Sequence, residues 1–218
     1  MSAPEIAIVD YGVGNIFSLR SSFAAVGYGA TLAKTPEELE RADKIVVPGV
    51  GAFAAAREKL AATGMDETLV QLAAAGRPIL GICLGMQMFF ERSFENGEHE
   101  GLGLLPGNVR PISDALDGAG LSREERAELK VPHIGWGKLH LIDPQHPLFR
   151  KLREGDYAYF LHSYYAADCE PVQIATTDYG LPLTAAAARE NVMGCQFHPE
   201  KSGDLGLSII QAFCEEVQ

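Results

Sequence analysis

Cysteine is scarce in this sequence. The chain has 218 residues but only four cysteines, and they form neither a Cys-x-x-Cys pair nor a spacing typical of metal ligands. This excludes a disulfide scaffold and a zinc-binding motif, so we expect Cys169, Cys195 and Cys214 to be buried thiols that behave as small apolar side chains. We expect no metal and no cofactor.

Positive charge is also in short supply. Lys and Arg number 18 against 29 Asp and Glu, which gives a formal net charge of -11, and no basic run interrupts this balance. Binding to a phosphate backbone requires clustered positive charge, so we expect no nucleic-acid partner.

Long hydrophobic runs are missing as well. The apolar stretch near the N-terminus has no basic residues before it and is broken at Asp10. Because a signal peptide or an anchor needs a longer uninterrupted run, we expect no membrane association and a cytoplasmic protein.

The rest of the composition is that of a globular domain, with 47% hydrophobic residues. A chain of this length can bury a large core, so we predict one domain over residues 1–218. Short β-branched runs alternate with Ala-rich stretches, which is typical of βαβ units with a buried parallel sheet. The predicted strands are 6–10, 44–49 and 77–83, and the predicted helices run from an N-cap at Asn15 to Gly27 and from Ala52 to Ala75, divided at Gly64.

The second half of the chain has a different pattern. Its strand-like runs KLHLI, YAYFLHSYY, VQIATT and LTAAAA follow one another closely, so we expect antiparallel or mixed additions to the sheet. A final amphipathic helix is predicted from about Leu205 to Val217, with Leu207, Ile210 and Phe213 on one side.

Residues 113–130 are charged and contain few apolar side chains. We interpret them as a surface insertion with one short helix. Ser122 is its predicted N-cap, and Glu125 stands at the position that completes a capping box.

The most informative segment is RPILGICLGMQMFF. An apolar strand leads into Gly-x-Cys-x-Gly and then into a helical pattern, which is the arrangement of a nucleophile elbow with Cys83 as the nucleophile. Gly81 and Gly85 leave room for a strained backbone at the bend. The alternative is an ordinary strand end around a buried cysteine.

A second segment, NVMGCQFHPEKS, places His198 and Glu200 directly after a strand. By itself this pattern is weak, because a single histidine near a strand end is often structural. Together with the elbow it indicates a Cys-His-Glu triad for acyl transfer, in which the carboxylate orients the imidazole.

These motifs resemble a known family. GICLGMQ followed by QFHPE is similar to the class I, triad-type glutamine amidotransferases over nearly the whole chain. Five segments further resemble the glutaminase subunits of imidazole glycerol phosphate synthases in histidine biosynthesis: DYGVGNIFS (10–18), PGVGAF (48–53), PHIGWG (132–137), FLHSYY (160–165) and QFHPEKS (196–202). The resemblance implies a flavodoxin-like α/β fold, with a mixed, mostly parallel central sheet flanked by helices.

The resemblance also implies roles for individual residues. Cys83 attacks the side-chain amide of L-glutamine, His198 protonates the departing ammonia, and Glu200 fixes the histidine tautomer. The oxyanion is held by the N–H groups of Val50 and Leu84. Further residues line the glutamine site: Gly49, Gly51, Gln87, Glu95, Ser163 and Tyr164.

Gly49 and Gly51 let the Val50 peptide turn between an idle and a competent orientation, or else they form an ordinary turn after a strand. Glu95 pairs with the α-ammonium group of glutamine by the same resemblance. Without the resemblance, Glu95 would be interpreted as a solvated surface charge.

The implied partner is a (β/α)8 synthase (cyclase) subunit, bound as a heterodimer, which uses the ammonia to form imidazole glycerol phosphate and AICAR. Asn15, Ser18, Trp136 and Lys201 resemble the residues that face this partner. Trp136 is either an interface hot spot or core filling. Gly137 stands where the family usually has Asn, and 113–130 lengthens a connection that is normally short.

Three other functions remain open from the sequence. The chain could be a glutaminase that serves another acceptor, as in pyridoxal phosphate or GMP synthesis, but DYGVGN and GWG argue against this. It could be a non-catalytic flavodoxin-like binding module, although the triad residues are all present. It could also be a hydrolase that acts without a partner, which full glutamine turnover by the isolated chain would reveal.

Overall fold

The computed structural model describes residues 3–217 of the chain. In chain order the first half consists of β1 (Ile6–Val9), α1 (Ile16–Ala25), β2 (Ala30–Ala33), α2 (Pro36–Glu40), β3 (Lys44–Val47), α3 (Phe53–Ala62), α4 (Met65–Ala74), β4 (Ile79–Ile82), α5 (Leu84–Gln87), β5 (Arg92–Ser93), β6 (His99–Glu100) and β7 (Asn108–Pro111). The second half consists of α6 (Ile112–Gly118), α7 (Arg123–Glu128), β8 (His133–Leu141), η1 (Pro147–Phe149), β9 (Tyr157–His162), β10 (Tyr164–Ala167), η2 (Glu170–Val172), β11 (Gln173–Asp178), β12 (Pro182–Arg189), β13 (Val192–Cys195), η3 (Pro199–Lys201) and α8 (Gly203–Glu215).

Within the described residues, nine strands form one mixed sheet in the order β2-β1-β3-β4-β13-β12-β11-β8-β9. The strands from β2 to β13 run parallel, and β12, β11, β8 and β9 are added antiparallel. Every residue of β1, β3, β4 and β13 is buried, which, apart from Lys44 at the start of β3, agrees with their continuous apolar sequences. The predicted antiparallel additions in the second half of the chain are confirmed.

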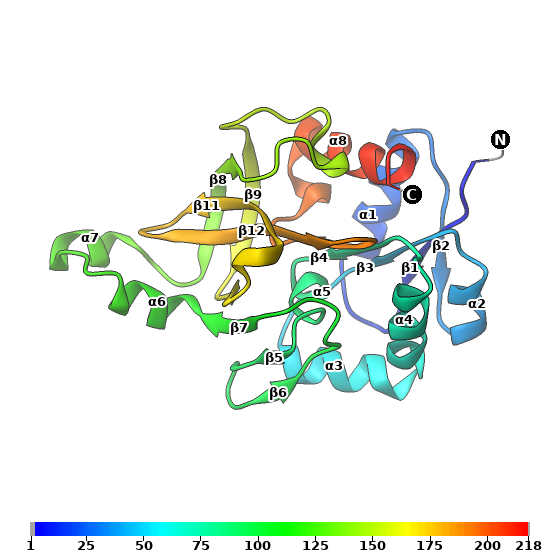
Figure 1. Ribbon diagram of the computed structural model, residues 1–218, viewed down its shortest axis with the longest axis horizontal. Helices are drawn as coiled ribbons and strands as arrows, with labels where there is room; N and C mark the ends of the chain where they lie inside the picture. The colour runs from blue at the N-terminus through cyan, green and yellow to red at the C-terminus, as the bar shows by residue number, and fades with distance from the viewer. Residues whose placement is uncertain (1–2, 218) are drawn as a thin grey trace.

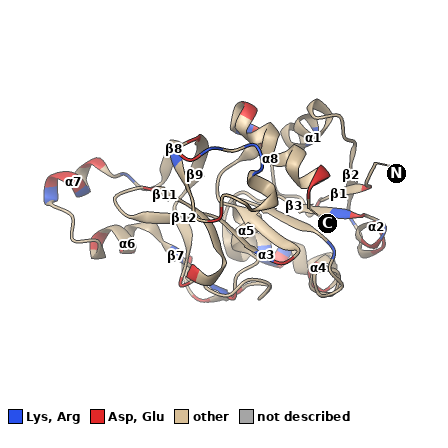
Figure 2. Ribbon diagram, turned by 45° about the horizontal axis from the view of Figure 1, so that its top comes forward, with Lys and Arg blue, Asp and Glu red and all other residues tan. Residues whose placement is uncertain are grey.

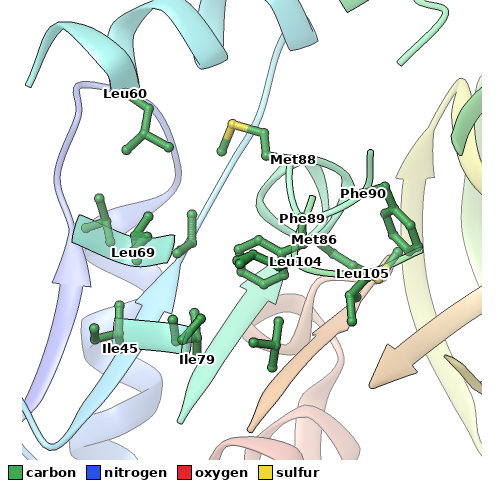
Figure 3. Packing of buried hydrophobic residues seen from close by; sticks show 14 of the residues in the cluster. Ile45, Leu60, Leu69, Ile79, Met86, Met88, Phe89, Phe90, Leu104 and Leu105 are labelled. Carbon is green, nitrogen blue, oxygen red and sulfur yellow. The ribbon is translucent and has the colours of Figure 1, made fainter. Parts of the chain in front are cut away.

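Helices cover both faces of this sheet (Figure 1). On one face α1 and α8 lie together and bury side chains such as Phe23 and Phe213 in a common cluster. On the other face α3, α4 and α5 pack against the parallel strands. Figure 3 shows Leu60 of α3 and Leu69 of α4 in one apolar cluster with Ile45 of β3. The resulting three-layer arrangement leaves the carboxyl ends of the parallel strands open at one edge of the sheet.

The predicted elements of the first half are present. The three predicted strands are β1, β3 and β4, and the Asn15 side chain caps α1 by accepting a hydrogen bond from the N–H of Ser18. Gly64, with a φ of +72°, separates α3 from α4. The sequence pattern does not predict β2 and α2, because β2 (ATLA) is not a continuous β-branched run and α2 has only five residues, too few to show a helical period.

The predicted terminal helix is α8, which begins two residues earlier than expected, at Gly203. Ile210 and Phe213 are buried as predicted, whereas Leu207 is only half-buried. The prediction for 113–130 is correct for α7, where Ser122 and Glu125 form both hydrogen bonds of the capping box. It is wrong in expecting one helix, because α6 precedes α7 and buries Ile112 and Leu116 in a small cluster of its own.

A second, four-stranded sheet has the order β10-β7-β5-β6. The chain passes from the large sheet to this small sheet between β9, which ends at His162, and β10, which begins at Tyr164. Ser163 therefore lies where the two sheets meet.

Charged residues lie mainly on the outer helices and loops, and α7 carries both signs (Figure 2). Among residues 3–217, we find no helix that is both long and apolar enough to cross a membrane.

Candidate active site

Cys83 occupies a strained bend between β4 and α5. Its φ of 54° and ψ of -113° lie outside the regions that side-chain-bearing residues favour, and such strain is typical of a nucleophile elbow. A Cβ atom at Gly85 would collide with the carbonyl oxygen of Val47, and one at Gly81 would lie 2.6 Å from the backbone of Met86. Both glycines are thus required for the bend, as the motif predicts.

The sulfur of Cys83 lies among polar groups of other elements. The side-chain amide of Gln196 donates a hydrogen bond to Sγ at 3.5 Å, and Sγ lies 4.0 Å from the carbonyl oxygen of Leu161. Gln87 donates to Oε1 of Gln196 at 2.9 Å, which fixes the amide so that its NH2 group faces the sulfur. A donor at this position stabilises a thiolate.

His198 and Glu200 follow β13 and come close to the sulfur because β13 pairs in parallel with β4. Cys195 is the register partner of Ile82, so the residues after each strand emerge at the same edge of the sheet. The Nδ1 atom of His198 lies 2.9 Å from Oε1 of Glu200, and both side chains are buried.

The protonation of His198 follows from these contacts. Burial alone disfavours the imidazolium, but hydrogen bonds and charge interactions with Cys83 and Glu200 outweigh it and raise the pKa of His198 to about 9. At neutral pH the ring is therefore charged and paired with the sulfur on one side and the carboxylate on the other.

Two backbone N–H groups belong to residues that line the cavity around the sulfur. Leu84 is the first residue of α5, so its N–H has no carbonyl partner within the helix. Val50 follows β3 in a loop where Gly51 has a φ of +96°. Gly49 packs so closely on the elbow that a Cβ atom there would lie 2.5 Å from the N–H nitrogen of Gly85. The loop after β3 is thus pressed against the elbow.

A cavity of about 250 Å³ opens over Cys83 and His198. Most of the predicted glutamine-site and oxyanion residues line it, and Gly49 lies behind them. The lining residues are Val50, Gly51, Cys83, Leu84, Gln87, Glu95, Pro132, Leu161, His162, Ser163, Tyr164 and His198. A volume of this size suits one amino acid, and the mouth is bordered by the half-exposed Val50.

Glu95 is held in this cavity by the start of a helix. Its Oε2 atom accepts a hydrogen bond of 2.6 Å from the N–H of Phe53, the first residue of α3. The side chain is half-buried, so Glu95 is not a freely solvated surface charge. A fixed carboxylate in a cavity suits a substrate ammonium group.

The four residues predicted to face a partner are not part of the cavity lining. Trp136 is 57% exposed, so it is not core filling, and its ring packs edge-on against Tyr159 at 6.0 Å between centroids. The ammonium group of Lys201 lies over the Tyr159 ring, 5.8 Å from its centroid. Asn15 and Ser18 lie at the N-terminus of α1, which packs against η3.

Gly137 occupies a position with no space for a side chain. A Cβ atom there would lie 2.7 Å from Oγ1 of Thr177 and 2.9 Å from the ring of Phe160. These two side chains fill the volume that an Asn would need, so the hydrogen bond of such an Asn has no counterpart in this chain.

Several residues of the site are not among the predicted ones. Gln196 stands inside the quoted QFHPE motif, but its contact with the sulfur depends on the pairing of β13 with β4. Pro132, Leu161 and His162 come from PHIGWG and FLHSYY, and no local pattern indicates that they line the cavity. The other three cysteines are buried and free, and the described residues contain no group of three or more metal-ligating side chains.

Comparison with known proteins places the chain among relatives along nearly its whole length. A family model described as "Glutamine amidotransferase class-I" matches residues 7–217. The chain is 47% identical over 209 residues to imidazole glycerol phosphate synthase subunit HisH of Sulfurimonas denitrificans, covering 95% of this chain and 96% of that protein. It is 43% identical to the subunit of the same name from Bacillus subtilis, with coverage of 95% and 94%.

Solved structures share the fold at low sequence identity. PurLQS of Thermotoga maritima matches with a TM-score of 0.71 at 18% identity, covering 97% of this chain and 98% of that chain. A structure described as a glutamine amidotransferase matches with a TM-score of 0.69 at 17% identity, covering 95% and 98%.

Proposed function

This chain belongs to the class I glutamine amidotransferase family, and we propose that it is the glutaminase subunit of an imidazole glycerol phosphate synthase. The observation that carries the proposal is the cavity over Cys83, in which the sulfur, the charged His198 and a fixed carboxylate at Glu95 face one space. The relatives described above, at 43% and 47% identity, are named as subunits of this synthase.

Acylation begins from the thiolate of Cys83. The sulfur attacks the side-chain amide carbon of L-glutamine, and the carbonyl oxygen becomes an oxyanion held by the N–H groups of Leu84 and Val50. The imidazolium of His198 then gives its proton to the amide nitrogen, which leaves as ammonia while a glutamyl thioester remains on Cys83.

Deacylation uses the same groups in reverse. Neutral His198 removes a proton from water, and the resulting hydroxide attacks the thioester carbon. The tetrahedral intermediate collapses to glutamate and the thiolate, and His198 is again an imidazolium. Glu200 holds the ring in one orientation through both steps because it accepts the hydrogen of Nδ1.

Substrate binding follows from the rest of the cavity. Glu95 receives the α-ammonium group of glutamine, and Ser163 and Tyr164 lie at the junction of the two sheets, where they receive the α-carboxylate. Gln87 and Gly51 complete the walls. In these assignments the carboxylate of Glu95 meets the ammonium group, and the hydroxyl and backbone donors of residues 163 and 164 meet the carboxylate.

Ammonia made here needs a shielded route, since it becomes protonated and loses its nucleophilicity in neutral water. We therefore include in the proposal a (β/α)8 synthase (cyclase) subunit that docks over the cavity mouth as a heterodimer and forms imidazole glycerol phosphate and AICAR. An exposed apolar face supports this docking. Ile134, Trp136 and Leu161 point to the same side of the β8–β9 pair, beside the cavity.

The proposal further treats the chain as one domain that works in the cytoplasm. Its four cysteines are free thiols, which suits a reducing compartment.

The test is to mix the chain with a (β/α)8 synthase subunit and measure glutamate release with and without the acceptor nucleotide. We expect low release by the isolated chain and a rise in the complex, because in this proposal docking turns the Val50 peptide from an idle orientation to one in which it is an oxyanion donor. The matched control is Cys83→Ala, which abolishes glutamine-dependent synthesis but leaves synthesis from added ammonia. Fast turnover without a partner, or equal loss of both activities in Cys83→Ala, contradicts the proposal.

A further inference from the structure

Segment 112–130 meets the rest of the protein at the turn between β11 and β12. Figure 1 shows α6 and α7 beside the end of this hairpin. Gly180, at the tip of the turn, has a φ of +74°, and a Cβ atom there would lie 2.5 Å from Leu129 and 2.9 Å from Leu116. The turn is therefore seated in the small apolar cluster in which Ile112 and Leu116 of α6 and Leu129, after α7, pack with Leu183 of β12.

Tyr179, next to Gly180, is fixed at both ends of its side chain. Its hydroxyl donates a hydrogen bond of 2.6 Å to the carbonyl oxygen of Lys130, at the end of the segment. Its ring stacks on His133 with 4.1 Å between centroids, and Phe160 stacks on the opposite face of His133 at 5.0 Å. His133 is thus held in a sandwich, one side of which depends on segment 112–130.

His133 in turn contacts the wall of the cavity over Cys83. Its Nδ1 atom lies 3.1 Å from Nε2 of His162, and Nδ1 of His162 lies 2.9 Å from the carbonyl oxygen of Tyr164. Because a carbonyl can only accept, His162 must donate from Nδ1, so its Nε2 accepts and Nδ1 of His133 donates. One tautomer of each ring satisfies both bonds.

Both rings are neutral at physiological pH, as this arrangement requires. Burial lowers the pKa of His133 to about 4 and is also the main reason that the pKa of His162 falls to about 3. The carbonyl oxygen of Tyr164 also accepts a hydrogen bond of 3.0 Å from Gln87, whose amide orients Gln196 toward the sulfur. The two histidines therefore help to fix the Tyr164 carbonyl group. This group links the cavity wall at residues 163–164 to the side-chain amides of Gln87 and Gln196 beside the sulfur.

We propose that segment 112–130 is a positioning device for the glutamine site, which acts through Tyr179 and the His133–His162 pair. The segment fixes Tyr179, Tyr179 fixes His133, and His133 selects the His162 orientation that holds residues 163–164 against the cavity. Tyr179 and His133 are positioning residues, since neither touches glutamine. The substrate named here depends on the proposed function, whereas the coupling of the segment to His162 does not.

The test compares Tyr179→Leu, which removes the stack and the hydroxyl, with Tyr179→Phe, which removes only the hydroxyl. In the complex with the synthase subunit, we expect Tyr179→Leu to raise KM for glutamine roughly 3- to 20-fold with kcat changed less than twofold. Because Tyr179→Phe keeps the stack on His133, we expect its KM for glutamine to stay close to the wild-type value. Tyr28→Leu, a half-buried tyrosine packed in the cluster under α1 and α8, is the matched control, and its KM stays at the wild-type value.

A second readout does not depend on glutamine turnover. In the full chain labelled with ¹⁵N-histidine, NMR reports the tautomer of each neutral ring, and we expect His162 to be an Nδ1–H tautomer that becomes mixed in Tyr179→Leu. An unchanged His162 tautomer together with an unchanged KM overturns the inference, as does an equal fall of kcat and kcat/KM in Tyr179→Leu and Tyr28→Leu. Absence of glutamine turnover by the wild-type complex refutes the proposed function instead, and the NMR result then decides the coupling alone.

Discussion

Nδ1 of His198 and Oε1 of Glu200 lie 2.9 Å apart, with only 2% and 3% of the two side chains exposed to solvent. Because the carboxylate is fixed on Nδ1, the Nε2 side of the ring is left for the sulfur of Cys83. The pair is two residues apart across Pro199, so a single short 3-10 turn positions both groups. Hydrogen bonds and charge interactions with Cys83 and with this carboxylate together raise the pKa of His198 to about 9.

The raised pKa of His198 predicts a pH profile. The charged ring gives its proton to the amide nitrogen that leaves as ammonia, so kcat/KM for glutamine in the complex falls as the pH rises through about 9. Glu200→Gln removes one of the groups that raise this pKa, so the fall moves to lower pH, toward the ordinary histidine value of about 6.5. Measurement of glutamate release between pH 5 and pH 10 would locate both transitions.

Asp204→Asn, an exposed carboxylate in the first turn of α8, is the control for this experiment and leaves the profile unchanged. If the high-pH transition of Glu200→Gln coincides with that of the wild type, His198 is not the group that titrates.

Glu95→Gln tests the substrate site. The amide still accepts the hydrogen bond from Phe53 N–H but loses the charge that faces the α-ammonium group of glutamine. Loss of one charged hydrogen bond costs about 1.5–3 kcal/mol, so we expect KM to rise roughly 10- to 100-fold with a smaller effect on kcat. Steady-state kinetics of the complex provide the measurement.

Glu98→Gln is the matched control, because Glu98 is an exposed carboxylate paired with Arg92 outside the cavity. A KM for Glu95→Gln within twofold of the control would show that the ammonium group binds elsewhere.

Trp136→Ala tests the docking face. The indole is more than half exposed and packs on Tyr159, so its removal exposes little core but deletes a large apolar contact for a partner. Interface hot spots contribute about 2 kcal/mol or more, which predicts a rise in Kd for the synthase subunit of roughly 30-fold. Titration calorimetry of the two subunits measures this, while the Tm of the isolated chain changes little.

Ile142→Ala serves as the control, since Ile142 is exposed to a similar degree just beyond the end of β8. The opposite pattern for Trp136→Ala, with a large fall in Tm and an unchanged Kd, would assign the residue to folding instead.

Lys44→Met tests a contact that stabilises the fold. The ammonium group of Lys44, at the start of β3, donates to the carbonyl oxygens of Phe213, Cys214 and Val217 at the end of α8. Methionine keeps the length but leaves these buried acceptors without a donor, which costs about 2 kcal/mol and lowers Tm by about 4–8 °C. Thermal unfolding measures the change.

For Lys59→Met, on the exposed side of α3, we expect no shift in Tm. An equal or higher Tm for Lys44→Met would mean that the cost of burying the charge exceeds the benefit of its hydrogen bonds.

The sequence by itself determined the features that depend on neighbours along the chain. The bend at Cys83 needs glycine on both sides, the cap at Asn15 needs a side-chain acceptor, and the capping box at Ser122 needs Glu125 three residues later. The two caps are contacts over a few residues and the elbow is a five-residue motif, so each pattern is visible without a fold, although the Val47 carbonyl oxygen that excludes a side chain at Gly85 lies 38 positions away. The buried strands β1, β3 and β4 follow in the same way from continuous apolar runs.

Only the tertiary structure decided which distant residues share the site. Gln196 reaches the sulfur because β13 pairs with β4 in one register, and a shift by one residue would turn its side chain to the other face of the sheet. Glu95 reaches Phe53, and Tyr179 reaches His133, across 42 and 46 positions of the chain. The physical reason is that burial and hydrogen bonding act between any groups that the packed chain brings together, whereas a sequence pattern records only the groups that are close along it.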